Sequence, residues 1–128
     1  MINVFIVYFL LKNHAVNTAF EGGGIYLNEN AHNLMVIDVI VTDCAAYNNG
    51  GFLHAQLTND HLTVSFSQFL NNEASNQGGV FYLHDTNDYF KVLYSDFLNN
   101  RAYHGGAVQM NANNNNMVVD NCRFINNR

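Results

Sequence analysis

The chain contains neither proline nor tryptophan, and its two cysteines are Cys44 and Cys122. One pair of thiols cannot supply the dense disulfide framework of a small secreted scaffold, and the two cysteines stand at different places in the repeat described below, so we expect free thiols. Basic residues are also scarce: five Lys and Arg stand against ten Asp and Glu, for a net charge of −5. Without a basic stripe to neutralise a phosphate backbone, we expect no nucleic-acid partner.

Asparagine is abundant instead, with 23 copies in 128 residues. This residue is a poor helix former and is favoured in turns and in stacked side-chain ladders. Hydrophobic residues make up 48% of the chain, which is enough for the core of one compact domain. The composition therefore predicts a single all-β domain.

A repeat runs through most of the chain. Glycine pairs begin at Gly22, Gly50, Gly78 and Gly105, in steps of 28, 28 and 27 residues. Apolar columns keep their distance from these pairs: Ile25, Leu53, Phe81 and Val108; Val36, Val64, Val92 and Val119; Val41, Phe69, Phe97 and Phe124. Apolar and polar residues alternate around them, which predicts two short strands in each copy, each with one buried face. Polar segments such as 28–33 and 111–116 are predicted to be turns.

One copy is too small to bury its own apolar face, whereas stacked copies share a continuous core. We therefore predict a solenoid of about four coils in which equivalent strands pair in parallel and each coil adds about 4.8 Å. Equivalent residues then lie above one another. Two columns are predicted to form amide ladders: Asp43, Asn71, Asn99 and Asn126; Cys44, Asn72, Asn100 and Asn127. The glycine pairs open each coil where positive φ and the lack of a Cβ are needed.

Two short motifs accompany each other along the chain: GGVF at 78–81 with FLNN at 97–100, and GGAV at 105–108 with FINN at 124–127. This pairing resembles the polymorphic outer membrane protein repeat of the pectin-lyase-like superfamily, over residues 22–128. The resemblance implies a right-handed, single-stranded parallel β-helix with coils of 27–28 residues, and an extracellular or cell-surface location. It does not specify a function, because the superfamily includes adhesins, surface proteins, polysaccharide lyases and hydrolases.

Residues 1–21 precede the repeat domain at 22–128 and contain an apolar run from Ile2 to Leu11. The run is too short to span a membrane. As a secretory signal it lacks a preceding basic residue and a small-residue cleavage site. The alternative is a strand of a partial coil, with Val4 and Phe9 in the valine and phenylalanine columns. We favour the strand and keep the signal-like segment as the alternative.

Acidic residues provide weak candidates for a metal site. Asp60 and Asp88 share a turn column on neighbouring coils, and carboxylates are ligands that Ca²⁺ prefers. Asp96 and Arg123 also occupy equivalent positions, and we interpret them as an exposed ion pair. No two histidines share a column and no cysteine pair has ligand spacing, so we expect no zinc site. We assign no catalytic or cofactor-binding residue and expect that the protein is not an enzyme.

One outward column is a candidate ligand surface. Tyr26, His54 and Tyr82 follow one another on successive coils, and the column ends in Gln109. Sugars stack on aromatic strips of this kind, although tyrosine is also common on ordinary exposed β surfaces.

Three hypotheses for the function follow. The first is a non-catalytic β-helix module of a surface or extracellular protein, with an adhesive or spacer role. The second is a carbohydrate-active β-helix, and the third is a structural subunit of a larger assembly. The expected partners are other coils or proteins at the ends of the solenoid, with glycans as a further class.

Overall fold

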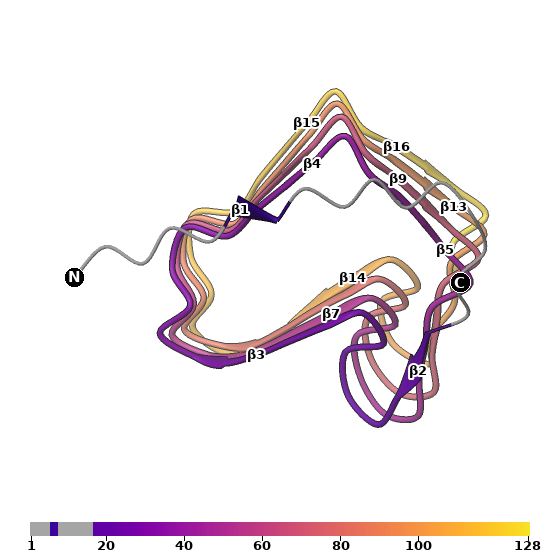
Figure 1. Cartoon of the computed structure of the whole chain (residues 1–128), viewed down its shortest axis with the longest axis horizontal. Coiled ribbons are helices and arrows are strands. Elements are labelled where there is room, and N and C mark those ends of the chain that lie inside the picture. The colour runs from indigo at the N-terminus through magenta and orange to yellow at the C-terminus, as the bar shows by residue number, and fades with distance from the viewer. Residues whose placement is uncertain (1–5, 8–16) are drawn as a thin grey trace.

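The computed structural model describes residues 6–7 and 17–128, and in these ranges it contains strands and no helix. The strands form four parallel sheets, each named here after one of its strands (Figure 1). The β3 sheet contains β3 (Ile25–Glu29), β7 (Leu53–Leu57), β11 (Phe81–Asp85) and β14 (Val108–Met110). The β4 sheet contains β1 (Ile6–Val7), β4 (Met35–Ile37), β8 (Thr63–Ser65), β12 (Lys91–Leu93) and β15 (Val118–Asp120).

The other two sheets complete each coil. The β5 sheet contains β5 (Ile40–Thr42), β9 (Gln68–Leu70), β13 (Asp96–Leu98) and β16 (Arg123–Ile125). The β2 sheet contains β2 (Thr18–Ala19), β6 (Ala45–Ala46) and β10 (Glu73–Ala74). No helix in the described ranges is long and apolar enough to cross a bilayer.

The pairing register confirms the predicted solenoid. Ile25 pairs with Leu53, Leu53 with Phe81, and Phe81 with Val108, so the coils repeat every 28, 28 and 27 residues. Seen from the N-terminal end, the chain winds clockwise as it recedes from the viewer, which is the right-handed sense (Figure 1). The chain is therefore a right-handed parallel β-helix of about four coils.

The coil contains more strands than the two predicted. A residue with positive φ follows the predicted second strand and separates the β4 sheet from the β5 sheet. This position is occupied by Asp38, Phe66, Tyr94 and Asn121. The mixed residue types concealed the bend in the sequence, because a phenylalanine or tyrosine is not typical of a left-handed position.

Left-handed backbone explains the abundance of asparagine. The described residues include sixteen non-glycine positions with positive φ, and ten of them are Asn or Asp. Asn and Asp tolerate this conformation because their short polar side chains can hydrogen-bond locally. The first glycine of each pair also has positive φ, with values of 57° at Gly22 and 65° at Gly78, as predicted.

Stacked aromatic and aliphatic side chains fill the space between the sheets. The Phe69 and Phe97 rings lie 4.9 Å apart, and the Phe97 and Phe124 rings lie 4.6 Å apart, centroid to centroid, in nearly parallel stacks. Phe81 meets this column edge-on from the β3 sheet. The valine column, from Val36 to Val92, is also buried.

The amide-ladder prediction is confirmed for one of its two columns. The Asn72 backbone N–H donates to Asn100 Oδ1 at 2.9 Å, and the Asn100 backbone N–H donates to Asn127 Oδ1 at 3.0 Å. The neighbouring column, which begins at Asp43, instead supplies left-handed residues at the bend. A second ladder that the sequence analysis did not predict joins Asn59, Asn87 and Asn114 through the same backbone-to-side-chain bonds.

The described part of the N-terminal segment is the short strand β1. Val7 pairs with Val36, whereas the predicted strand placed Val4 in that column. The register therefore differs from the prediction by three residues. The other predictions for this segment, including Phe9 and the signal-like alternative, fall on residues outside the described ranges.

Candidate functional site

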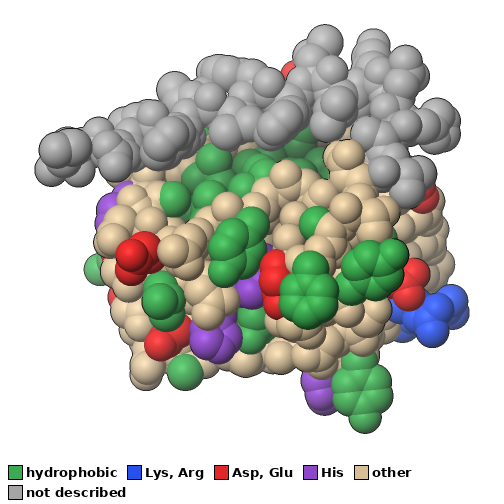
Figure 2. Space-filling model, turned by 60° about the horizontal axis from the view of Figure 1, so that its bottom comes forward, with side chains coloured by type: hydrophobic (Ala, Val, Ile, Leu, Met, Phe, Trp, Pro, Cys, Tyr) green, Lys and Arg blue, Asp and Glu red, His purple; other side chains and the backbone are tan. Residues whose placement is uncertain are grey.

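The candidate site lies on the outer face of the β3 sheet. Tyr26, His54, Tyr82 and Gln109 pair in register across β3, β7, β11 and β14, so the predicted column is real. Its rings contact one another edge to face, with centroid distances of 5.1 Å for Tyr26–His54 and 4.8 Å for His54–Tyr82. Figure 2 shows hydrophobic, histidine and acidic side chains gathered on this side of the molecule.

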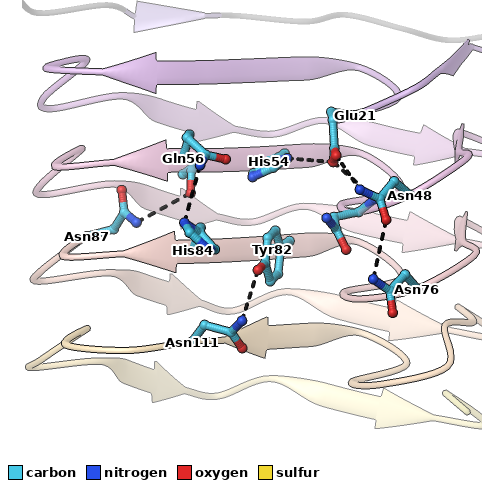
Figure 3. Close-up of polar contacts among 11 residues, drawn as sticks. Glu21, Asn48, His54, Gln56, Asn76, Tyr82, His84, Asn87 and Asn111 are labelled. Atoms are coloured by element: carbon cyan, nitrogen blue, oxygen red, sulfur yellow. Dashed lines mark hydrogen bonds and ion pairs between the residues drawn. The ribbon is translucent and has the colours of Figure 1, made fainter.

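Exposure varies strongly along the column. Tyr26 is 48% exposed, whereas His54 is 2% and Tyr82 is 3% exposed. The turn that leads from the β2 sheet into the β3 sheet bends back toward the β3 sheet (Figure 1), and its residues Glu21 and Asn48 lie beside His54 (Figure 3). The column is therefore not a continuous open platform for sugar rings. Glycan binding by Tyr26, His54 and Tyr82 stays a prediction, and in this conformation Tyr26 alone of the three is accessible.

Glu21 connects this turn to the sheet. Its carboxylate accepts hydrogen bonds from His54 Nδ1 at 2.7 Å, from Asn48 Nδ2 at 2.5 Å and from the Asn49 backbone N–H at 3.1 Å (Figure 3). Hydrogen bonds to a charged acceptor are the stronger kind. One side chain thus joins the turns of the first two coils to β7.

His54 carries an oriented imidazole with one unused nitrogen. Because Nδ1–H donates to the Glu21 carboxylate, Nε2 is left as the acceptor, and it is buried without a hydrogen-bond partner among the described residues. Gln56 lies on this side of the ring, and its Nε2 is 3.3 Å from His84 Nδ1 (Figure 3). A carboxylate-oriented histidine can act as a proton acceptor or metal ligand. Burial keeps solutes away from Nε2 in this conformation.

Burial and Glu21 act in opposite directions on His54. Desolvation is the largest effect and lowers the pKa of the imidazole below its ordinary value, while the hydrogen bond and charge of Glu21 raise it. Burial also raises the pKa of the Tyr82 phenol, and the Glu21 charge adds to this increase. The Tyr82 hydroxyl accepts a hydrogen bond from Asn111 Nδ2 at 2.9 Å (Figure 3).

We predict that His54 titrates below the ordinary histidine pKa of about 6.5 and that Glu21→Gln lowers its pKa further. A base with a lowered folded pKa contributes its full stability above the unfolded pKa, and this contribution declines as the pH falls from the unfolded pKa to the folded pKa. Ring chemical shifts measured by NMR against pH report the pKa directly. Glu29→Gln is the matched control, because Glu29 is exposed on β3 and the charge change is the same. Equal shifts in both variants would contradict the assigned contact.

The acidic calcium candidates make coil-to-coil hydrogen bonds. The Asp88 backbone N–H donates to Asp60 Oδ1 at 2.9 Å, and the Asn115 backbone N–H donates to Asp88 Oδ1 at 2.7 Å. Asp60 Oδ2 is also 3.8 Å from His32 Nδ1. Within residues 17–128, no group of three or more His, Cys, Asp and Glu side chains is arranged to hold a metal ion. Calcium binding by the two aspartates stays a prediction.

The predicted ion pair between Asp96 and Arg123 is present on the outer face of the β5 sheet. Arg123 Nε is 2.7 Å from Asp96 Oδ1, and Nη2 is 2.5 Å from Oδ2. The guanidinium hydrogen bonds lower the pKa of the Asp96 carboxyl. The two thiols are free, as predicted, and burial raises the pKa of Cys44.

Sequence reasoning missed Glu21 and Gln56. Glu21 precedes a glycine pair and belongs to residues 1–21, which the sequence analysis placed before the repeat domain. A signal was present: the residues directly before the four glycine pairs are Glu21, Asn49, Gln77 and His104, all polar. Bridges from Asn49 to Gln77 and from Gln77 to His104 show that this is a true column. Polar side chains that recur at the same turn position on successive coils indicate that this turn makes contacts of its own.

Comparison with known proteins gives no relative: no family model, curated protein or solved structure matches the chain.

Proposed function

We propose that the chain is a rigid, non-catalytic β-helix module of a surface or extracellular protein, with an adhesive or spacer role. The observation that carries this proposal is the set of polar columns in which side chains hydrogen-bond to the next coil. Asn72, Asn87 and Asn100 are fully buried and all take part in such bonds. The hydrogen-bonding groups of these asparagines thus join each coil to the next.

Three separate corners are fixed in this way. Besides the two asparagine ladders, the Ser67 backbone N–H donates to Ser95 Oγ at 3.1 Å, and the Val39 backbone N–H donates to Ser67 Oγ at 3.3 Å. Hydrogen bonds in a buried, low-dielectric environment are electrostatically stronger than those in water. Three fixed corners around a stacked aromatic core favour a stiff rod, the property that a spacer or a display scaffold requires.

The outer faces are free to differ from coil to coil without disturbing the core. Outward positions carry residues as unlike as Tyr26, His54 and Gln109 in a single column. An adhesive role would use such positions, and the glycine and phenylalanine motifs resemble those of surface proteins. We therefore propose the extracellular or cell-surface location together with the function.

The last described coil offers a contact surface. Val119 and Phe124 are 44% and 46% exposed, whereas their equivalents on the preceding coil, Val92 and Phe97, are fully buried. The backbone edges of β14, β15 and β16 lie on the same rim. Exposed strand edges with apolar neighbours pair readily with other strands. We propose other coils or proteins as the partners of this rim.

The test combines a change of length with a test for turnover. Duplicating residues 51–78 should add one coil of about 4.8 Å while keeping cooperative unfolding, which small-angle scattering and chemical denaturation measure. The protein should leave the chain length of a panel of acidic and neutral polysaccharides unchanged with and without Ca²⁺. Beads coated with the protein should be retained on extracellular matrix or cells.

Two results would contradict the proposal. Calcium-dependent depolymerisation that is abolished by Asp60→Ala or Asp88→Ala would establish the carbohydrate-active alternative. A duplicated chain that loses cooperativity or does not lengthen would show that the coils do not act as an extendable rod.

A further inference from the structure

A polar groove lies outside the site described above, at the corner between the β5 sheet and the β2 sheet. It has a volume of about 580 Å³. One wall is formed by Asn71, Asn99 and Asn126, and the other by Glu73, Arg101 and Arg128. The asparagine ladder that includes Asn72 and Asn127 forms the floor. The corner is the right-hand one in Figure 1, beside the C-terminal end.

Two arginines are stacked in this groove. Glu73 and Arg101 form a parallel bridge, and the Ala102 backbone N–H donates to the Arg128 carbonyl at 2.8 Å, which places Arg128 one coil beyond Arg101. Among the four basic residues in 17–128, these are the two that share a column. Like charges on directly neighbouring strands repel each other. An anion bound between the two side chains would offset this repulsion.

The carboxylate present in the column does not neutralise the pair. Arg101 Nη1 is 3.9 Å from Glu73 Oε1, and the two side chains are 62% and 55% exposed. Arg123 differs from Arg101, because its guanidinium donates two short hydrogen bonds to Asp96 on the adjacent coil. The side chains of this column, two guanidinium groups and one carboxylate, sum to a charge of +1 in a protein whose net charge is −5.

The opposite wall supplies uncharged donors. Asn71, Asn99 and Asn126 have φ values of 56°, 57° and 54°, so all three leave the corner in the same left-handed conformation. Within the described chain their side-chain amides make no hydrogen bond, whereas the side-chain amides of Asn72 and Asn100, in the ladder beneath them, both donate one. Amide N–H groups are therefore available at the spacing of the coils, facing the same groove as the arginines.

We propose that this groove binds an oxyanion, a carboxylate, sulfate or phosphate group, between Arg101 and Arg128, with Asn99 and Asn126 as additional donors. Planar guanidinium groups bind such anions through paired hydrogen bonds, and the amides add directional donors without adding charge. This inference is independent of the proposed function, since a spacer needs no such site.

The test is an NMR titration of the isotope-labelled 128-residue protein at constant ionic strength. Acetate, sulfate and inorganic phosphate are the three probes, and their order of affinity shows whether the groove prefers a carboxylate, a sulfate or a phosphate group. We expect saturable shifts of the Asn99 and Asn126 side-chain amides and of the arginine Nε–H groups. Arg101→Gln and Arg128→Gln should each weaken binding about five-fold or more, since each removes one charged donor.

Two further variants separate a site from general attraction. Arg123→Gln makes the same charge change outside the groove and should alter the affinity by less than about two-fold. Glu73→Gln removes the competing carboxylate and should tighten binding by about two-fold or more. Backbone spectra check that every variant is folded, as expected for exposed positions. Shifts that do not saturate, or equal weakening by Arg101→Gln and Arg123→Gln, would overturn the proposal.

Discussion

Replacing Asn100 by alanine is expected to lower the free energy of unfolding by about 3 to 5 kcal/mol, because several buried groups lose their partner at once. The Asn100 side chain is fully buried. Its Oδ1 accepts from the Asn72 backbone N–H at 2.9 Å and from Asn72 Nδ2 at 3.0 Å. Its Nδ2 donates to the Phe69 carbonyl at 3.0 Å. In the variant these groups lose their partners in a buried environment, where an unpaired polar group is costly.

Chemical denaturation monitored by circular dichroism gives the unfolding free energy of Asn100→Ala. The matched control is Asn99→Gly, which removes an amide from the neighbouring residue. Asn99 has a φ of 57° and its side chain lies in the groove, so glycine keeps the backbone and breaks no buried bond. The control should stay within about 0.5 kcal/mol of the parent protein. A loss below about 1 kcal/mol for Asn100→Ala would show that the ladder does not hold the coils together.

The repeat could be predicted from the sequence because the core uses the same apolar columns on every coil. Phe69, Phe97 and Phe124 keep one distance from their glycine pairs, and a column of this kind has no other simple explanation than stacking. The parallel register and the coil length followed directly. These features depend on averages over four coils, so one irregular residue does not conceal them.

The bend between the β4 and β5 sheets could not be predicted, because the residue type at the bend differs from coil to coil. Asp38 and Asn121 suit a left-handed position, whereas Phe66 and Tyr94 do not. The Phe66 and Tyr94 rings stack at 5.1 Å with nearly parallel planes. Contact between the rings offsets part of the backbone strain, and this contact is not visible in a sequence pattern.

The candidate site could be predicted only in part, because strand register is visible in the sequence and turn contacts are not. The column of Tyr26, His54 and Tyr82 follows from the strand register, which the repeat fixes. The burial of His54 depends on Glu21, which lies 33 residues before it and belongs to a turn rather than to a strand. Turn conformations are not specified by the alternation that reveals strands. The sequence analysis therefore predicted the column as a surface, and the structure shows two of its three rings covered.

Replacing Gly79 by alanine is expected to destabilise the protein by about 3 kcal/mol or more, because two backbones meet at this position. A Cβ on Gly79 would lie 2.0 Å from the Gly106 carbonyl oxygen and 2.8 Å from the Arg101 backbone N. The same contact recurs between Gly51 and the Gly79 carbonyl at 2.1 Å. Backbone atoms cannot rotate away as a side chain can, so the coils would have to separate and their ladder bonds would lengthen.

Gly24→Ala is the control for this prediction. Its Cβ would meet the Phe52 ring at 2.6 Å, and a ring can shift where a backbone cannot. The equivalent positions on the next coils hold Phe52, Val80 and Ala107, so this column accepts side chains. Chemical denaturation should give a clearly smaller loss for Gly24→Ala than for Gly79→Ala.

If Gly79→Ala does not fold, Gly106→Ala provides a graded measurement. Its Cβ would lie 2.3 Å from the Arg128 backbone N, a contact with the last residue of the chain. This approach is longer than the 2.0 Å contact at Gly79, so the variant should fold with an intermediate loss of stability. Equal stability of Gly24→Ala and Gly106→Ala would mean that the second glycine of each pair is not needed for close contact between coils, and that the glycine pair is explained by positive φ at its first residue alone.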